Sequence, residues 1–373
     1  MNQVKTGEKP RILVAPLDWG LGHATRCIPL VRSLLQAGAE PWLAGEGAQE
    51  LLLRREFPEL PFLSLAGYRV QYGRSAAGLT WQMIRQVPKL KKSIRAEHSW
   101  LETAAAEFRF AGIISDNRYG LYHRSVPSVI ITHQLLIKTP LGGLSERILQ
   151  HQNYRYLNRF SRCWVPDWPG KENLAGELAH PRKMPEVPVD YIGPLTRFNA
   201  TKATTAPGAG KAPHLLFVLS GPEPQRTLLE NKILETIHRW SGTATIVRGL
   251  PGEATHLPST GMIACYNHLS AADLEDIFLK ADFIISRSGY STVMDAMALG
   301  KKCIFIPTPG QTEQEYLGRY LQDKGYALTI KQEEFSLEHA LEQARNFSYR
   351  FPDTNLANRL DNIVSNWLAS LSV

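Results

Sequence analysis

Short apolar runs alternate with segments of helical periodicity along most of the chain. The runs are rich in Ile, Leu and Val and are bounded by Gly, Pro, Ser or Asp, which is typical of strands buried on both faces of a parallel sheet. They fall at residues 11–16, 112–115, 128–132, 245–247, 283–285 and 303–307, and at the start of 214–224. The alternation predicts an α/β protein built from doubly wound sheets.

A change of composition divides this pattern in two. Residues 196–213 are small, polar and rich in Pro and Gly, without apolar periodicity, which predicts a linker. The segments on either side begin alike, with a buried strand, a Gly-containing turn and a helix. At 373 residues the chain exceeds most single cores. We expect an N-terminal Rossmann-like domain over 1–195, a C-terminal one over 214–354, and a final helix within 355–373.

The most informative loop lies between an apolar strand and a helix in the segment 286–300, S-R-S-G-Y-S-T-V-M-D-A-M-A-L-G. Gly289 would let the backbone approach a bound group or adopt a positive φ. Ser291 or Thr292 is expected to cap the helix, whose free N–H groups would face an anion. A phosphorylated ligand fits this loop. The alternative is that Thr292 and Asp295 form a capping box and the loop binds nothing.

A second polar loop, T-P-G-Q-T-E-Q-E-Y at 308–316, follows the next strand. Gln311, Glu313, Gln314 and Glu315 offer the planar donors and acceptors that pair with sugar hydroxyls. Both loops would lie at the carboxyl edge of the second sheet, where open α/β sheets bind ligands.

The first loop of the chain, D-W-G-L-G-H-A-T-R at 18–26, contains Gly20 and Gly22 but lacks the third glycine of a dinucleotide site. It places His23 and Arg26 on a new helix instead. The positive end of that helix would lower the pKa of His23 and favour the neutral imidazole of a general base. Alternatively, this histidine only makes a local hydrogen bond near the helix start.

Asp116 directly follows the strand at 112–115, so it is expected at the same sheet edge as His23. A carboxylate there could orient the imidazole during proton abstraction. The alternative is that Asp116 caps the turn D-N-R-Y-G. Thr132, His133 and Gln134 end the next strand and are expected on the acceptor side with Gly20, Gly22 and Arg26.

Together the loops at 286–300 and 308–316 resemble the donor-binding segment of GT-B nucleotide-sugar glycosyltransferases. They are most similar to the family that adds N-acetylglucosamine to the lipid-linked peptidoglycan precursor. In that family, R-S-G-x-x-T-x-x-E and Q-Q-Y segments hold the ribose and the sugar. The resemblance implies that Asp295 binds ribose and that Gln314 and Glu315 bind the sugar, although the family pattern has glutamate and a second glutamine at positions 295 and 315. The expected donor-binding residues are Ser220, Gly221, Arg248, Arg287, Ser288, Gly289, Ser291, Thr292, Asp295, Gln311, Gln314 and Glu315.

The first loop, G-L-G-H-A-T-R, resembles that of GT-B transferases and also that of related UDP-sugar hydrolases. The resemblance implies two facing Rossmann-like domains with a cleft between them, with His23 as base and Asp116 as its partner. We expect an inverting transferase that uses a UDP-sugar, with N-acetylglucosamine as the expected sugar, and needs no metal or cofactor. A UDP-sugar hydrolase or epimerase, or a non-catalytic nucleotide-sugar-binding protein, would fit the same motifs.

Net charge and hydropathy bear on partners. A net charge of +7 and a pI near 9.2 favour anionic partners, but no nucleic-acid signature appears. Residues 79–95 mix apolar and basic side chains and predict either a helix on an anionic membrane surface or a solvated basic face interrupted by Pro88. No apolar run suits a membrane span or signal peptide, so we expect a cytoplasmic protein, peripheral at the inner face of the membrane. The four cysteines are widely spaced, which argues against a zinc site or a disulfide framework.

Overall fold

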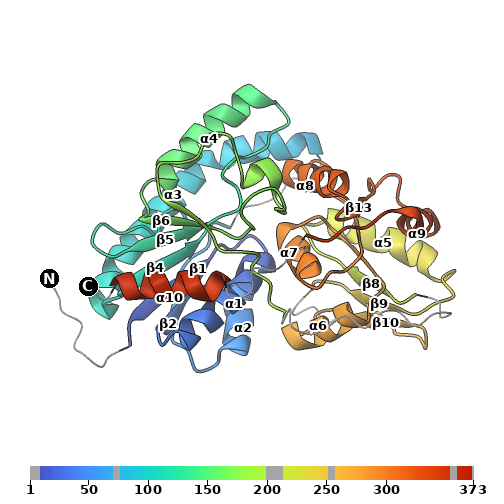
Figure 1. Cartoon of the computed structure of the whole chain (residues 1–373), viewed down its shortest axis with the longest axis horizontal. Coiled ribbons are helices and arrows are strands. Elements are labelled where there is room, and N and C mark those ends of the chain that lie inside the picture. The colour runs from blue at the N-terminus through green and yellow to red at the C-terminus, as the bar shows by residue number, and fades with distance from the viewer. Residues whose placement is uncertain (1–8, 70–75, 199–212, 251–256, 353–358, 372–373) are drawn as a thin grey trace. The chain divides into compact units, whose positions relative to one another are not determined.

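The computed structural model describes residues 9–69, 76–198, 213–250, 257–352 and 359–371 (Figure 1). These residues form two compact units. Unit 1 contains residues 9–69, 82–195 and 359–371, and unit 2 contains residues 76–81, 196–198, 213–250 and 257–352. The predicted linker lies mostly outside the described residues.

Unit 1 is built on a seven-stranded parallel sheet with the strand order β3-β2-β1-β4-β5-β6-β7. The order reverses between β1 and β4, which pair with Pro16 opposite Asp116. The strands are β1 (Arg11–Pro16), β2 (Glu40–Gly45), β3 (Phe62–Ser64), β4 (Gly112–Asp116), β5 (Ser128–Ile131), β6 (Arg162–Val165) and β7 (Val189–Tyr191). The central strands are buried along their whole length, as their continuous apolar runs predict.

Helices cover both faces of this sheet. Leu13, Ala15 and Ile113 point to one face and pack against Leu101 and Ala104 of α3. On the other side α1 contacts α2 and α10, as Figure 1 also shows. The helices are α1 (Leu21–Gln36), α2 (Gly47–Glu56), α3 (Ala76–Phe108), α4 (Gly143–Leu157), a short 3₁₀ helix at Gly176–Leu178, and α10 (Arg359–Leu371).

The last helix of the chain belongs to unit 1. Trp367 of α10 meets Trp164 of β6 edge-on, with ring centroids 5.5 Å apart. A methyl group on Gly112 would lie 2.6 Å from the Trp367 ring, so the indole occupies the space left by a missing side chain at the start of β4. The chain therefore returns to its first unit after completing the second.

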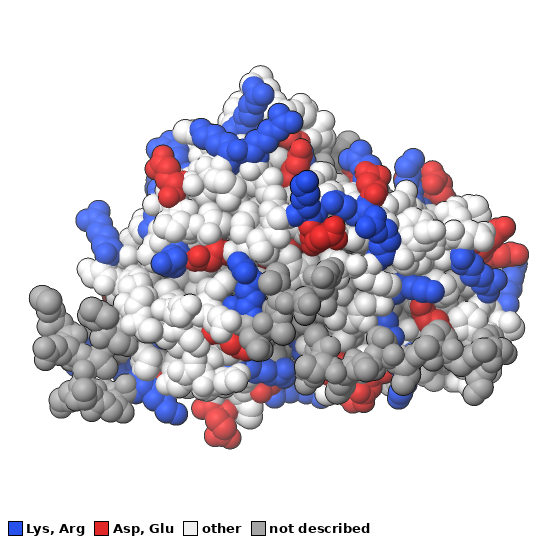
Figure 2. Space-filling model, viewed as in Figure 1, with Lys and Arg blue, Asp and Glu red and all other residues white. Residues whose placement is uncertain are grey.

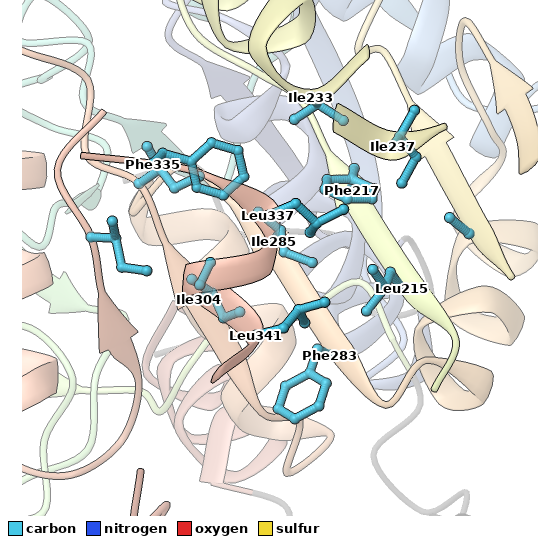
Figure 3. Packing of buried hydrophobic residues seen from close by; sticks show 14 of the residues in the cluster. Leu215, Phe217, Ile233, Ile237, Phe283, Ile285, Ile304, Phe335, Leu337 and Leu341 are labelled. Carbon is cyan, nitrogen blue, oxygen red and sulfur yellow. The ribbon is translucent and has the colours of Figure 1, made fainter. Parts of the chain in front are cut away.

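Unit 2 repeats the plan with six parallel strands in the order β10-β9-β8-β11-β12-β13. Figure 3 shows its core, in which Leu215, Phe217 and Ile285 of the sheet pack under Ile233 of α5 and Leu341 of α9. The strands are β8 (Leu215–Val218), β9 (Ala244–Val247), β10 (Ile263–Tyr266), β11 (Phe283–Ser286), β12 (Cys303–Phe305) and β13 (Leu328–Thr329). The helices are α5 (Gln225–Ile237), α6 (Ala271–Lys280), α7 (Tyr290–Ala298), α8 (Thr312–Asp323) and α9 (Leu337–Asn346).

The predicted fold class, two Rossmann-like parallel-sheet domains, is confirmed. The expectation that Pro88 interrupts its helix is wrong, because α3 runs through it from Ala76 to Phe108. The buried side chains of Ile94, Leu101 and Ala104 anchor the part of α3 beyond the proline, and this packing outweighs the missing hydrogen bond. In the described part of the chain, no helix is both long and apolar enough to cross a membrane.

Candidate active site

His23 stands at the carboxyl edge of the sheet in unit 1, in the first turn of α1. The backbone reaches that helix through Gly20, whose φ of 76° is in the left-handed region that glycine adopts without strain. Gln49 of α2 donates to the carbonyl oxygen of Gly20 at 3.2 Å, which fixes the turn. The imidazole side chain is 14% exposed, and within the described residues only Nδ1 of its ring is hydrogen-bonded. Nε2 is therefore available to a substrate.

Asp116 lies beside His23 because β1 and β4 are parallel neighbours that end together. Its Oδ2 is 3.1 Å from His23 Nδ1. The guanidinium of Arg26 donates from Nε to Oδ2 at 2.7 Å and from Nη2 to Oδ1. Ser115 rather than Asp116 caps the turn that follows β4, because Ser115 Oγ accepts a hydrogen bond from the Arg118 N–H at 3.1 Å.

The electrostatics of this cluster favour a charged carboxylate and a neutral imidazole. Burial by itself would raise the pKa of Asp116, but Arg26 and His23 together lower that pKa to about 2. Burial also lowers the pKa of His23, and the Arg26 charge lowers it further, against the opposing effect of Asp116. Neutral imidazole is the form that accepts a proton.

A second buried ion pair holds the surrounding loops. Arg118 donates to Glu97 of α3 at 2.6 Å, and Tyr68 donates to the same carboxylate at 2.6 Å. Arg118 also donates to the carbonyl oxygens of Pro16 and Ala66. This pair therefore ties the ends of β1 and β4 to the segment after β3. No sequence motif predicts this ion pair.

The predicted acceptor-side residues divide into two groups. Gly20 is the N-cap of α1, and Gly22 lies in the first turn of that helix next to His23. Arg26 is 2% exposed and His133 5% exposed, so both lie beneath the surface of the loop. His133 Nδ1 is 3.4 Å from Arg26 Nη1. Arg26 therefore contacts both His23 and Asp116, and its place on the acceptor side stays a prediction.

In unit 2 the loop after β11 differs in detail from expectation. The helix α7 begins at Tyr290, and its N-cap is Gly289, without a side-chain cap. The predictions that Ser291 or Thr292 caps the helix, or that Thr292 opens a capping box, are therefore wrong, because both residues already lie inside the first turn. Gly289 has a φ of −70° rather than a positive value, and a Cβ there would meet no atom of the described residues within 4 Å. Neither strain nor packing in the protein accounts for a glycine at this position.

Arg287 precedes this loop and is fully buried. Its Nη1 donates to the carbonyl oxygen of Ile306 at 3.1 Å, and its Nη2 donates to Gln225 O and Gln332 Oε1 at 2.6 Å each. Its Nε has no hydrogen-bond partner among the described residues. Burial lowers its pKa to about 10, which leaves it charged at neutral pH. No carboxylate of the described residues pairs with it, whereas the buried arginines Arg26, Arg118, Arg226 and Arg248 each pair with one.

Asp295, the expected ribose ligand, is 2% exposed and engaged by the chain that enters unit 2. Thr196 donates to Oδ1 at 2.8 Å and Arg197 Nε donates to Oδ2 at 3.0 Å. Burial nevertheless raises the pKa of Asp295, with Arg197 opposing the rise. The partners of Asp295 thus offset the cost of burying its negative charge less completely than Arg26 and His23 do for Asp116.

The loop at 308–316 is held by its own predicted sugar-binding side chains. Gln314 accepts from the Thr308 N–H at 2.9 Å and donates to Gln311. Glu315 accepts from the Gly310 N–H at 2.8 Å. Ser288 Oγ donates to the Gln314 carbonyl oxygen at 2.8 Å, so the structure joins the two loops that the sequence singled out.

The remaining donor-side residues lie at the ends of β8 and β9. Arg248 donates to both carboxylate oxygens of Glu230, at 2.6 and 3.1 Å, so its charge is already paired. Ser220 and Gly221 follow β8, and Gly221 has a φ of 104° that requires glycine. Like the other donor assignments, these remain predictions.

Sequence reasoning missed the partners of the buried charges. Thr196 and Arg197 lie at the start of the predicted linker, and Glu97, Glu230 and Gln332 lie in helical or loop segments without a motif. No sequence spacing connects Asp295 to residues about a hundred positions earlier. Within the described ranges, no cluster of three or more His, Cys, Asp or Glu side chains could hold a metal ion.

Comparison with known proteins agrees with this architecture. Residues 265–363 match the Glycosyltransferase family 28 C-terminal domain. A UDP-N-acetylglucosamine--N-acetylmuramyl-(pentapeptide) pyrophosphoryl-undecaprenol N-acetylglucosamine transferase from Pasteurella multocida is 36% identical over 344 residues, 89% of this chain and 87% of that protein. The enzyme of the same name from Haemophilus influenzae is 34% identical over 351 residues, 91% of each chain. The crystal structure of the kitacinnamycin glycotransferase superimposes with a TM-score of 0.60, covering 98% of this chain and 96% of that one at 15% identity.

Two Rossmann-like parallel-sheet domains that match solved glycosyltransferases over nearly their whole length define a GT-B fold. With 36% of the aligned residues identical to a transferase across most of both chains, the protein belongs to glycosyltransferase family 28. It is a glycosyltransferase, and the resemblance seen in its loops is confirmed.

The Asp295 ion pair generates a stability prediction. Arg197→Gln leaves the carboxylate buried without its charge partner, so the free energy of unfolding should fall by about 3 kcal/mol at pH 7. Because the unfolded chains of both proteins titrate alike, the loss should be small where Asp295 is protonated in the folded unaltered protein. It should grow as pH rises through that folded-state pKa, which burial raises above the ordinary value. Urea denaturation followed by circular dichroism at pH 4.5 and pH 7.5 measures both effects.

Two controls accompany this prediction. Arg162→Gln breaks a pair with Asp190 of the same 3.0 Å length but with side chains 44% and 31% exposed, and should cost less than about 1 kcal/mol. The double variant Arg197→Gln/Asp295→Asn removes both charges and should recover most of the loss. Equal destabilisation in the single and double variants would contradict the ion-pair account.

Proposed function

We propose that this glycosyltransferase transfers N-acetylglucosamine from UDP-N-acetylglucosamine to a hydroxyl group of a lipid-linked acceptor, with inversion at the anomeric carbon. The observation that carries the proposal is the placement of His23, whose Nδ1 lies 3.1 Å from the buried Asp116 carboxylate and whose Nε2 is available. Burial and the Arg26 charge lower the pKa of His23, which favours the neutral imidazole. The donor and the class of acceptor follow the names of the Pasteurella and Haemophilus relatives.

The proton and the electron pairs have definite destinations in this reaction. His23 Nε2 takes the proton of the acceptor hydroxyl as its oxygen forms a bond to the anomeric carbon. The bond from that carbon to the UDP oxygen breaks, and UDP leaves with the electron pair. Asp116 stabilises the imidazolium that results and keeps the Nδ1 proton directed toward itself.

The donor diphosphate is assigned to unit 2. The buried charge of Arg287 is unopposed by any carboxylate of the described residues, so an anion above this loop would be attracted to it. The positive end of the α7 helix dipole reinforces that attraction. Gly289 adds to the case, because a ligand close to the backbone would explain a glycine that the protein itself does not require.

The ribose and sugar are assigned to Asp295 and to Gln311, Gln314 and Glu315. The raised pKa of Asp295 supports its part in this, because additional hydroxyl donors would stabilise its charged form. The sugar contacts would replace or share the hydrogen bonds that now hold the loop at 308–316. No resident cofactor takes part; the UDP-sugar is a co-substrate.

Replacing His23 with alanine tests the reaction directly. UDP release from UDP-N-acetylglucosamine, with the relatives' undecaprenyl-pyrophosphoryl N-acetylmuramyl-pentapeptide as acceptor, should slow by at least about a hundredfold. The dissociation constant for UDP should stay unchanged. His238→Ala at the exposed end of α5 is the matched control and should leave both quantities unaffected.

Two results would refute parts of this proposal. Unchanged turnover in the His23→Ala variant would remove the base assignment and favour a binding protein or another base. Free N-acetylglucosamine formed equally fast without acceptor would establish a hydrolase in place of a transferase.

A lipid-linked acceptor requires the protein to reach a membrane surface, and α4 offers a suitable region. Leu141, Leu144 and Ile148 are 72%, 75% and 63% exposed, and Leu144 and Ile148 are one helical turn apart. Arg147 and Arg155 of the same helix are also exposed. Figure 2 shows Lys and Arg side chains over the part of unit 1 where Figure 1 labels α4. Apolar side chains beside basic ones suit an anionic bilayer surface.

The segment at 79–95 fits a membrane-contacting surface less well than α4 does. The side chains of residues 79–87 lie outside the described part of the chain. Beyond them, Lys89, Lys91 and Arg95 are exposed, but Ile94 is buried in the core. The described portion thus presents a basic face without an apolar one.

Vesicle binding tests the α4 surface. Leu144→Gln/Ile148→Gln should weaken binding to vesicles of phosphatidylcholine and phosphatidylglycerol by at least about tenfold in cosedimentation, because two apolar side chains no longer enter the bilayer. Leu228→Gln, at a 46% exposed leucine on α5, is the control and should bind like the unaltered protein. Equal binding by all three proteins would refute a membrane contact at α4.

A further inference from the structure

We infer that Arg26 is a positioning residue for His23: its guanidinium holds the Asp116 carboxylate in place and keeps the histidine uncharged, with Nε2 as the proton-accepting atom. The catalytic meaning of this inference rests on the proposed function. The effect of Arg26 on the charge of His23 depends only on the arrangement of side chains in unit 1.

The first support is the two-point contact between guanidinium and carboxylate. Arg26 Nε and Nη2 donate to the two separate oxygens of Asp116. Such a fork fixes the plane of a carboxylate as well as its position. Arg26 is 2% and Asp116 1% exposed, so solvent does little to weaken the contact.

The second support is the position of His23 Nδ1, which lies 3.1 Å from Asp116 Oδ2 and 2.8 Å from Arg26 Nη2. With a proton on Nδ1, the ring donates to Asp116 and presents a lone pair at Nε2. Without it, Nδ1 would accept from Arg26, and Nε2 would carry a hydrogen and be unable to act as a base.

The amide of Asn117 favours the first of these two tautomers. Its amide is best satisfied with the nitrogen donating to Thr132 Oγ1 at 2.8 Å, which places its oxygen 3.3 Å from Arg26 Nη2. One Nη2 hydrogen then bonds to Asp116 and the other has an acceptor in Asn117. The guanidinium no longer needs Nδ1 as an acceptor, and the ring is free to donate its Nδ1 proton to Asp116.

The third support comes from the charges that face His23 from each neighbouring element. Arg26 and Cys27 lie on α1, Asp116 ends β4, and His133 follows β5. Burial raises the pKa of the Cys27 thiol well above its ordinary value, so Cys27 is neutral. Arg26 is therefore the permanent cation of the cluster and offsets the attraction of Asp116 for a proton on His23.

An NMR titration of the imidazole nitrogens tests the inference without any substrate. In Arg26→Gln the pKa of His23 should rise, since the carboxylate is no longer offset, and in Arg26→Lys the retained charge should keep it low. The acid limb of the kcat/KM profile should move to higher pH by about one unit in Arg26→Gln and return toward its original position in Arg26→Lys. Arg32→Gln, at a 54% exposed arginine on the same helix, is the matched control and should leave the titration unchanged.

A second comparison applies where Arg26→Gln does not fold. Asp116→Asn leaves no buried carboxylate to neutralise, so Arg26→Gln/Asp116→Asn should fold, and its His23 pKa should exceed that of Asp116→Asn alone. An unchanged His23 pKa in both comparisons would overturn the inference and leave Arg26 a structural role. A clear pKa change together with full activity of His23→Ala would uphold the effect of Arg26 on the charge of His23 and refute the proposed base, and with it the catalytic part of the inference.

Discussion

The need to neutralise a buried carboxylate governs the site in unit 1. Parallel pairing of β1 and β4 places Asp116 at the sheet edge, out of reach of water, and a lone carboxylate there would be costly. Arg26 meets that need, and its own position on α1 brings His23 to the same point. The loop, the start of the helix and the imidazole are thus arranged around one charge pair.

Unit 2 handles buried charge differently at the equivalent edge. Asp295 keeps a raised pKa despite Arg197, and Arg287 has carbonyl and amide partners but no carboxylate. In unit 1 the charges of Arg26 and Asp116 therefore balance each other within the protein. This balance leaves the His23 imidazole neutral and able to accept a proton. The charges left partly compensated in unit 2 suit a ligand that brings phosphate groups and hydroxyls.

The sequence predicted the fold well because a parallel sheet leaves a strong local signature. Each central strand is buried on both faces, so its apolar run is continuous and visible, and strand order then places His23 beside Asp116. The start of α7 and the partners of Asp295 could not be predicted. The start of α7 can shift by one or two residues with small changes in the first backbone hydrogen bonds, which local sequence does not determine. Arg197 contacts Asp295 only in the folded protein, because the two residues are about a hundred positions apart in the chain.

The central claim is that this glycosyltransferase binds a uridine nucleotide-sugar, and a thermal-shift screen of the whole chain tests it most directly. UDP, GDP, dTDP and their common sugar conjugates would be added separately, without metal, because a ligand of the native state raises Tm by mass action. The account predicts a selective rise of several degrees with UDP and a larger one with UDP-N-acetylglucosamine. No shift with any nucleotide, or a preference for GDP or dTDP, would contradict it.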